Sequence, residues 1–513
     1  MPWLGAYFAI ELHATATFFV QSELTLKSLS MSTLAITPAR TRNAKPASIL
    51  VGWDENEPAN PHNWSTKYKS WITFQLGMLA MAASLGSSII APAESTLADH
   101  FSISHEVAVL CISLYIIGFA FGPLCWAPFS ELWGRRLSLL PPMVGLGLFS
   151  IGTATSQNIQ SVLITRFFGG LFASSPVSNV GAIMGDIWAP KARGTAVVFY
   201  ALAVIGGPTL GPTIGAALVV NPHLSWRWTE YIQAIWTFAV TLVAIFNLPE
   251  TYSPVLLQNK AHRLRKETGN KAYYHTHEMT KLSPKTIITK HLSRPLLMLT
   301  TEPMVTCIAL YASFVYALLY MTLEVFPIVF QEEHGFGLVE SSLPFLALFV
   351  GVIFAMFVNL ANQPRYARLV DAAGGKPVPE ARCAPMAIGG VIFAIGLFWF
   401  GWTADPKIHW IAPVLAAVFI GAGFNIIFQQ CMNFLIDTYQ LYAASAVSAN
   451  TFLRSALAAA FPLVASPMFR NLGVGPAMSL VGGIAVLAIP VPFIFIKYGA
   501  TLRRRSEFAP IEE

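Results

Sequence analysis

The chain alternates between long apolar stretches and short polar ones. Twelve of the apolar stretches are long enough to cross a lipid bilayer as helices, which takes about 20 residues. They cover residues 71–92, 107–129, 137–155, 161–186, 194–220, 227–247, 303–330, 342–360, 384–402, 410–432, 444–468 and 476–497. Several are longer than the bilayer core requires, so we expect those helices to tilt or to extend beyond the lipid. The pattern predicts an all-α membrane protein.

The largest polar interruption divides these spans six and six, and it contains the basic run "NKAHRLRKETGNK". A 6+6 division around a polar linker is typical of transporters built from two helix bundles. The predicted parts are a cytoplasmic N-terminal tail (1–66), an N-terminal six-helix bundle (67–248), a basic cytoplasmic linker (249–302), a C-terminal six-helix bundle (303–498) and a cytoplasmic C-terminal tail (499–513).

The tail begins with the moderately apolar stretch "MPWLGAYFAIELHATATFFVQSELTL". It lacks the basic start of a signal peptide, and Glu11 and His13 interrupt it. We expect a disordered tail, or an extension of the gene model over residues 1–45. The alternative is a thirteenth span, which would place the N-terminus outside.

Composition and charge support a membrane protein. The 513 residues are 55% hydrophobic and 11% charged, with a mean hydropathy of +0.57, whereas soluble domains carry about 25% charged residues. If both termini are cytoplasmic, 27 of the 32 lysines and arginines lie in inner segments, as the positive-inside rule requires. The net charge of +6 therefore indicates a membrane surface and no nucleic-acid partner. We expect a multi-pass protein of the plasma membrane.

The residues that carry enzyme chemistry are scattered. The five cysteines form no CxxC pair, there is no GxxxxGK[ST] phosphate loop, and the histidines of the basic linker, including the pair in "YYHTH", lie in a flexible segment. We therefore expect no metal, no cofactor and no enzymatic activity.

The stretch "VIGGPTLGPTIGAAL" places helix-breaking residues inside an apolar span. Gly207, Gly211 and Gly215 recur every four residues and so share one helix face, which lets another helix approach closely. Pro212 allows a bend. We expect this face to lie where the two bundles approach each other. Ordinary small-residue packing is the alternative.

The stretch "APFSELWGRR" links spans two and three. Gly134 permits a tight turn, and Glu131 and Arg135 can form a charge-assisted pair. Asp186, at the inner end of span four, is the expected third member of this set, and Arg136 adds a second cation. We predict a conformational gate at the cytoplasmic surface. The alternative is that the two arginines serve only to set membrane orientation.

Two ionisable residues lie well inside predicted spans. Arg166 is roughly 9 Å deep in span four, and Glu324 lies in the outer third of span seven. The free-energy cost of placing such a residue in lipid is high unless its side chain faces a cavity or an interaction partner. We predict that Glu324 takes up and releases a proton and that Arg166 is the cation that favours its charged form. The alternatives are an interhelical hydrogen bond for Glu324 and snorkelling for Arg166.

Polar residues also gather in the C-terminal spans. The candidates for lining a substrate cavity are Asn425, Gln429, Asn450, Arg454 and Tyr316. Arg454 is near 15 Å deep, close to mid-membrane, and Asn450 shares its helix face. Hydrogen bonding between helices and aromatic packing are the alternative roles.

These motifs together resemble those of the major facilitator superfamily. The span-five stretch matches the antiporter pattern gxxxGPxxGG except at Ala216. The loop resembles G-x-L-x-D-x-x-G-R-[KR], and the departures that stand out are Ala127 in place of the first glycine and Glu131 in place of the aspartate. The stretches "PETYSPVLL", "FPIVFQEEHGF" and "YAASAVSANTFLRSALAAAFPL" resemble the fungal twelve-span drug:proton antiporters, a group that includes polyamine exporters and secondary-metabolite pumps. The resemblance covers residues 50–505.

The resemblance implies a major facilitator fold, with twelve transmembrane helices in two six-helix bundles. It also implies proton coupling through the span-four arginine, Arg166. The expected function is the export of a small organic molecule (a secondary metabolite, toxin or drug) in exchange for protons by alternating access. A polyamine exporter is the first alternative, and a non-transporting membrane receptor is the second. We expect a monomer whose partners are its substrate, protons and the bilayer.

Overall fold

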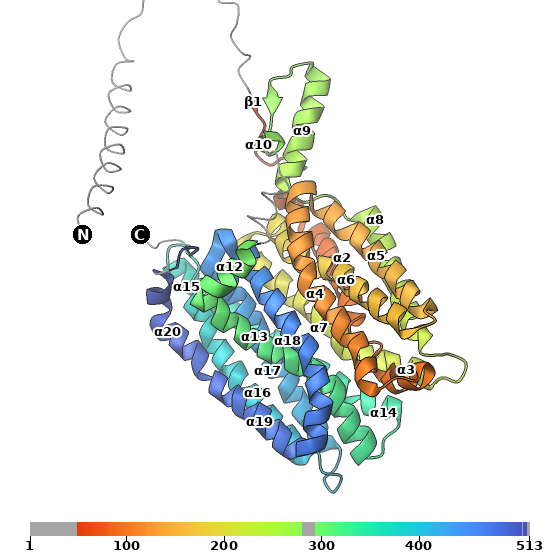
Figure 1. Ribbon diagram of the computed structural model, residues 1–513. Coiled ribbons are helices and arrows are strands. Elements are labelled where there is room, and N and C mark those ends of the chain that lie inside the picture. Colours follow the sequence, from red (N-terminus) through yellow and green to blue (C-terminus); the bar gives the residue numbers. More distant parts are fainter. Residues whose placement is uncertain (1–48, 280–292, 505, 510–513) are drawn as a thin grey trace, which may run out of the picture. The chain divides into compact units, whose positions relative to one another are not determined.

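The computed structural model describes residues 49–279, 293–504 and 506–509 (Figure 1). The possible gene-model extension and the possible thirteenth span therefore lie outside the described residues.

The first set of long helices is called the N-half here and covers residues 66–247. It consists of α2 (Thr66–Leu85), the short helices η2 (Ala91–Ala93) and α3 (Glu94–Phe101), and then α4 (His105–Trp133), α5 (Arg135–Thr155), α6 (Ile159–Ile187), α7 (Pro190–Val220) and α8 (Arg227–Asn247).

The second set, the C-half, covers residues 303–503. It consists of α13 (Pro303–Pro327) with its π-helical continuation η4 (Ile328–Glu333), α14 (Leu338–Ser342), α15 (Pro344–Ala372), η5 (Pro379–Arg382), α16 (Cys383–Thr403), α17 (Ile411–Tyr439), η6 (Gln440–Tyr442), α18 (Ala443–Leu472), α19 (Val474–Ala488) and α20 (Pro490–Arg503). The segment of the chain that links the two halves contains α9 (Ser253–Thr268), β2 (Tyr273–Tyr274), α10 (Thr276–Met279) and α12 (Ser293–Thr301).

Eleven helical segments within the described residues are long and apolar enough to cross a membrane. They correspond to the second through twelfth predicted spans. The first predicted span is α2, whose apolar character is reduced by Lys67, Lys69 and Gln75. It ends at Leu85 rather than near residue 92, because Ser87 and the residues after it form turns. The all-α membrane fold is confirmed.

Each half packs mainly on itself. In the N-half the pairs α4–α6, α5–α6, α2–α7 and α5–α8 are in contact; in the C-half the pairs are α16–α17, α13–α18, α15–α17 and α16–α19. The halves meet along α4–α18 and α7–α15, and Figure 1 shows the N-half in orange and yellow beside the green and blue C-half. The second helix of each half thus contacts the fifth helix of the other, as expected for two structural repeats.

The glycine face of α7 lies against α2 and the turn that follows it. A Cβ atom at Gly207 would stand 2.5 Å from the backbone nitrogen of Leu85, and one at Gly215 would stand 2.1 Å from the carbonyl oxygen of Ile89. At Gly211 the nearest atom is the hydroxyl of Ser88, at 2.2 Å. The expectation that this face lies where the two bundles approach each other is wrong, because the glycines make their close contacts within the N-half.

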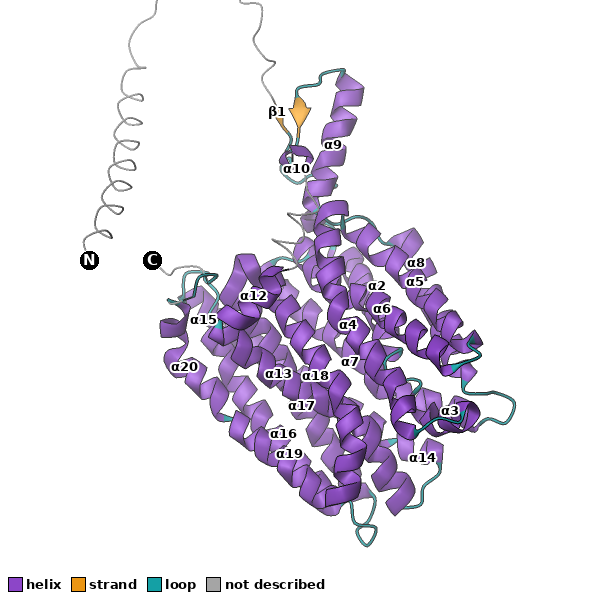
Figure 2. Ribbon diagram, in the orientation of Figure 1, coloured by secondary structure: helices purple, strands orange, loops and turns teal. Residues whose placement is uncertain are grey.

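The last part of the N-terminal tail is ordered. Strand β1 (Ile49–Leu50) pairs with β2 (Figure 2). The short helix η1 (Pro61–Asn63) precedes α2. Lys260 of α9 contacts Asp54 at 2.9 Å and Glu57 at 2.8 Å, and Val51 is buried against α9. The prediction of disorder up to residue 66 is therefore wrong for residues 49–66. This segment provides an apolar contact through Val51 and two carboxylates to α9.

The contact at Gly215 gives a stability prediction. Gly215→Ala should lower the free energy of unfolding by about 1–3 kcal/mol, because the added methyl group meets a backbone oxygen that cannot rotate away. Gly181→Ala in α6 is the matched control, since no atom lies within 4 Å of its added Cβ. Thermal unfolding of the purified proteins measures both changes. Equal melting temperatures for the two variants would contradict the close packing of α7 on α2.

Candidate functional site

The turn between α4 and α5 holds an ion pair. Gly134 has a φ of +94°, which suits glycine, and Arg135 follows it as the first residue of α5. The Nε atom of Arg135 donates to Asp186 of α6 at 2.9 Å, and its guanidinium lies 4.6 Å from the ring centre of Tyr252. The structure thus brings Arg135 and Asp186 together, as the sequence predicts. Glu131, one turn earlier, lines a small cavity between α4 and α18.

Glu250 completes this turn, and the sequence analysis missed it. Its carboxylate accepts hydrogen bonds from the backbone N–H groups of Arg135, Arg136, Thr251 and Tyr252, at distances of 2.8–3.1 Å. A Cβ at position 134 would stand 2.5 Å from Glu250 Oε2, so the carboxylate needs the glycine there. The available signal was the acid in "PETYSPVLL" directly after the sixth span.

The C-half carries an equivalent pair at the same end of the molecule. Arg382 comes just before α16, and its Nε atom donates to Asp437 of α17 at 2.9 Å. The hydroxyl of Tyr366 donates to the same carboxylate at 2.8 Å. Arg382 and Asp437 are 55 positions apart in the sequence, and Arg135 and Asp186 are 51 positions apart. The sequence analysis did not predict this second pair. Its signal is an arginine just before one helix and an aspartate near the end of the next helix.

Arg166 forms a buried ion pair with Glu230. The Nη1 atom of Arg166 lies 3.0 Å from Glu230 Oε1 of α8, and both side chains are 1% exposed. Its Nε atom donates to the carbonyl oxygen of Cys111 in α4 at 2.9 Å, and Tyr115 packs against its guanidinium. The predicted partnership of Arg166 with Glu324 is therefore wrong. Glu230 was overlooked because it lies in the first turn of its span, near Arg227.

Glu324 instead belongs to a cluster with Glu94 and His105, called the Glu–His–Glu cluster below. His105 Nε2 lies 3.6 Å from Glu324 Oε2 and 4.0 Å from Glu94 Oε2. Glu324 is 5% exposed and Glu94 is 8% exposed, and one carboxylate oxygen of each is buried without a hydrogen-bond partner among the described residues. Burial, followed by the charge of Glu324, raises the pKa of Glu94 well above that of an ordinary glutamate.

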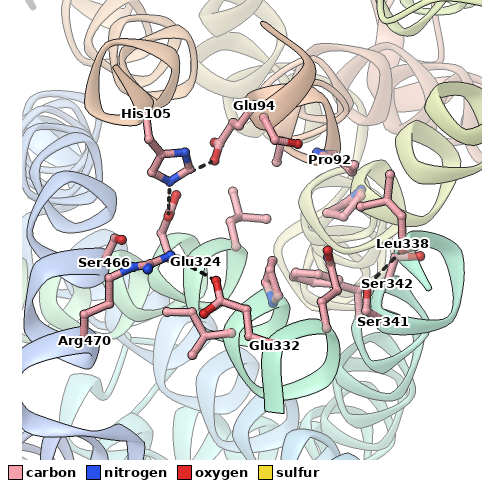
Figure 3. A pocket seen from close by; sticks show the side chains of 18 residues that line it. Pro92, Glu94, His105, Glu324, Glu332, Leu338, Ser341, Ser342, Ser466 and Arg470 are labelled. Carbon is pink, nitrogen blue, oxygen red and sulfur yellow. Dashed lines mark hydrogen bonds and ion pairs between the residues drawn. The ribbon is translucent and has the colours of Figure 1, made fainter. Parts of the chain in front are cut away.

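The cluster lines a cavity of about 240 Å³ between the halves (Figure 3). Figure 3 shows His105 between Glu94, which comes from α3, and Glu324, which comes from α13. Pro212 of the glycine motif also lines the cavity. The ligand atoms of the three ionisable groups lie within 4.8 Å of one another, a spacing that would suit a metal ion. We interpret them as an ionisable cluster, because the imidazole nitrogen already faces both carboxylates.

Hydrogen bonds join the halves near this cavity. The hydroxyl of Tyr320 donates to Ser87 Oγ at 2.9 Å, and the hydroxyl of Thr213 donates to the carbonyl oxygen of Ser342 at 3.0 Å. His105 and Glu324 also belong to different halves. The cluster therefore lies where any relative movement of the halves changes its geometry.

The predicted cavity residues of the C-half divide into two groups. Arg454 is 2% exposed and lies against the ring of Tyr316, so these two meet. Asn425 donates to the carbonyl oxygen of Val352 at 3.1 Å, and Gln429 accepts from Asn359. Both of these bonds tie α17 to α15, which is the alternative role stated above.

Asn450 is the remaining candidate. It is fully buried on α18, one turn before Arg454, and its amide nitrogen lies 3.1 Å from the sulfur of Met432.

Comparison with known proteins decides the family. Residues 76–462 match the sequence profile of the Major Facilitator Superfamily. The chain belongs to this superfamily. It is 38% identical to the Major facilitator superfamily multidrug transporter FLU1 of Candida albicans, over 98% of this chain and 84% of that protein. It is 40% identical to the efflux pump bik6 of Gibberella fujikuroi, over 92% of this chain and 97% of that protein.

A solved structure of the proton:xylose symporter XylE has the same fold, with a TM-score of 0.61 and 18% identity over 84% of this chain and 97% of that one. The resemblance to the fungal drug-efflux group of this superfamily is confirmed. Members of the superfamily are transporters, which also confirms that a transporter rather than an enzyme is the correct class.

The buried pair of Arg166 and Glu230 gives a second stability prediction. Glu230→Gln should lower the free energy of unfolding by about 3–5 kcal/mol, because it leaves the guanidinium charge uncompensated away from water. Glu332→Gln is the matched control. Glu332 pairs with Arg470 at the same 3.0 Å, but both side chains are more than half exposed, so the loss should be about 1 kcal/mol or less.

Thermal unfolding of both variants measures this difference. The double variant Arg166→Met with Glu230→Gln should recover part of the loss, since it removes both charges. Equal losses for Glu230→Gln and Glu332→Gln would show that burial does not strengthen the pair.

Proposed function

We propose that the protein exports a small organic molecule (a secondary metabolite, toxin or drug) in exchange for protons. The observation that carries this proposal is the Glu–His–Glu cluster, because Glu94 and His105 come from the N-half and Glu324 from the C-half. The relatives named as a multidrug transporter and an efflux pump support export of a small molecule.

Proton coupling follows from the position of the cluster. The bodies that rock against each other are the predicted bundles 67–248 and 303–498, so their movement changes the distance between His105 and Glu324. In this proposal Glu324 takes up the coupling proton in one state and releases it in the other, because its distance from the imidazole of His105 differs between the two states.

The charged groups around His105 set this balance. Glu94 and Glu324 face it from α3 and α13, Glu106 is its neighbour on α4, and Arg470 acts on it from α18. Arg166 contributes by holding α6 and α8 against α4, the helix that carries His105. His105 therefore replaces Arg166 as the cation that acts on Glu324.

The opposite end forms the conformational gate in this proposal. The ends of α4, α5 and α6 are held together there by Gly134, Arg135, Arg136 and Asp186. Arg382 and Asp437 do the same in the C-half. Glu131 lines the small cavity between α4 and α18. The excess of lysine and arginine on this side favours a cytoplasmic location for this end and both termini. The proposal includes a monomer in the plasma membrane.

Polyamine export is a second candidate function. The cavity is lined by the carboxylates of Glu94, Glu324 and Glu332, and a polyamine carries ammonium groups that such carboxylates bind. A non-transporting receptor is the alternative of another class, and it predicts no substrate flux under any proton gradient.

Glu324→Gln tests the coupling. Export driven by an imposed pH gradient should fall by about tenfold or more in proteoliposomes, because the amide cannot exchange a proton. Substrate binding should persist, because shape and hydrogen bonding are retained. Glu340→Gln, an acid that caps the nearby α14, should export normally. Two fluorescent probes, cationic rhodamine 6G and anionic naphthalene-2-sulfonate, cover both signs of charge. Undiminished export by Glu324→Gln would eliminate this residue as the proton carrier.

The gate is tested by Arg135→Ala and Glu131→Gln. Both variants should slow turnover several-fold and leave substrate affinity unchanged, because they act at the gate and make no substrate contact. Glu267→Gln on the exposed face of α9 is the control. Transport rates in proteoliposomes and equilibrium binding in detergent separate the two effects. Weakened binding with normal turnover would assign these residues to substrate recognition instead.

A further inference from the structure

Helix α18 carries a buried cation that no carboxylate neutralises among the described residues. Arg454 is 2% exposed, and its Nε atom has no hydrogen-bond partner in the part of the chain that the structure describes. Its guanidinium carbon lies 4.3 Å from the ring centre of Tyr316 and 4.9 Å from that of Phe428. Arg166 and Arg135, by contrast, each reach an acid within 3.0 Å.

A charge in this position is costly. Removing a guanidinium from water without an acid partner is unfavourable, and two aromatic faces offset only part of that cost. A merely structural arginine would be expected to have a carboxylate or a set of carbonyl oxygens around it. The unsatisfied donor instead indicates an anion that arrives from outside the chain.

The position of Arg454 suits a transported ligand. Helix α18 packs on α13 in its own half and on α4 in the other half. Arg454 therefore lies on the helix of the C-half that packs against the N-half, in the region that alternating access exposes to either side in turn.

The neighbouring groups fit one kind of ligand. Phe424 and Phe428 are stacked with ring centres 5.8 Å apart, and Tyr316 lies against both. Asn450, one turn from Arg454, is fully buried, and its side-chain oxygen accepts no hydrogen bond from the described residues. Aromatic faces bind flat rings, a guanidinium binds carboxylates or sulfonates, and a free amide oxygen accepts from a hydroxyl or N–H group.

We propose that Arg454 is the residue that selects the charge of the substrate, and that the exported molecule is an aromatic organic anion. This inference rests on the proposed export function and names its substrate class. The anionic group displaces the guanidinium from the rings of Tyr316 and Phe428 and pairs with it. The ring system of the ligand then takes the place beside the aromatic side chains.

A matched pair of probes tests the charge preference. Naphthalene-2-sulfonate is an anion at every pH used, and naphthalene-2-sulfonamide has nearly the same shape but is neutral. Calorimetric titration of the purified full-length protein should give an affinity for the sulfonate that is about tenfold higher, as expected for a charged hydrogen bond in a buried site. Arg454→Gln should abolish this preference, and Arg454→Lys should retain part of it.

Arg263→Gln on α9 is the control. It removes one positive charge from an exposed side chain and should leave the preference unchanged. Equal affinities of the unmodified protein for the two probes would overturn the proposal, and that result does not depend on the folding of any variant. An unchanged preference in Arg454→Gln with a normal melting temperature would overturn it as well.

Transport separates this inference from the proposed function. If neither rhodamine 6G nor naphthalene-2-sulfonate moves under a pH gradient, export itself fails, while the binding comparison still decides the role of Arg454. If rhodamine 6G or spermine moves and the sulfonate does not, export stands and the anionic substrate class is wrong. If the unmodified protein exports the sulfonate and the Arg454→Gln variant does not, the result supports both the export function and the anionic substrate class.

Discussion

The cost of a charge inside an apolar medium governs how this protein is assembled. A buried charged side chain must find a partner, and within this chain the partner usually lies on another helix. Arg166 pairs with Glu230 across α6 and α8, and Arg135 pairs with Asp186 across α5 and α6. Because each pair has one strongly favoured arrangement, the charges select which helices lie together among many similar apolar surfaces. The apolar surfaces drive insertion, and the few ionic contacts give the bundle its specific order.

The positions of the charges also separate tasks along the membrane normal. Pairs confined to one half, such as Arg382 with Asp437, stay intact when the halves move, and they keep each half rigid. His105 and Glu324 lie on opposite halves and are 3.6 Å apart, so their interaction depends on the movement. Arg454 has no acid partner among the described residues and lies between these levels. A rigid part, a movable ionic contact and an unsatisfied cation together make a sequence of binding and release physically possible.

A feature could be predicted from the sequence when a short sequence pattern or the order of the helices specifies it. The spans, the glycine face at Gly207, Gly211 and Gly215, and the meeting of Arg135 with Asp186 follow from short patterns and from the order of the helices. The pairing of Arg166 with Glu230, which are 64 residues apart, does not follow, because no local pattern specifies which acid a buried arginine reaches. Glu250 was missed for a related reason, since its role lies in backbone hydrogen bonds to a turn 115 residues earlier.

The contacts between the halves carry a consequence for the origin of the chain. The second helix of each half meets the fifth helix of the other, through α4 with α18 and α7 with α15. Two identical six-helix chains related by a two-fold axis would form the same reciprocal contact. In such a dimer both fifth helices would have to be alike. Here α7 has glycines where it closes onto α2, whereas α18 has Arg454. A single polypeptide does not impose this identity, so its fifth helices can differ: α7 provides close packing and α18 carries a buried charge.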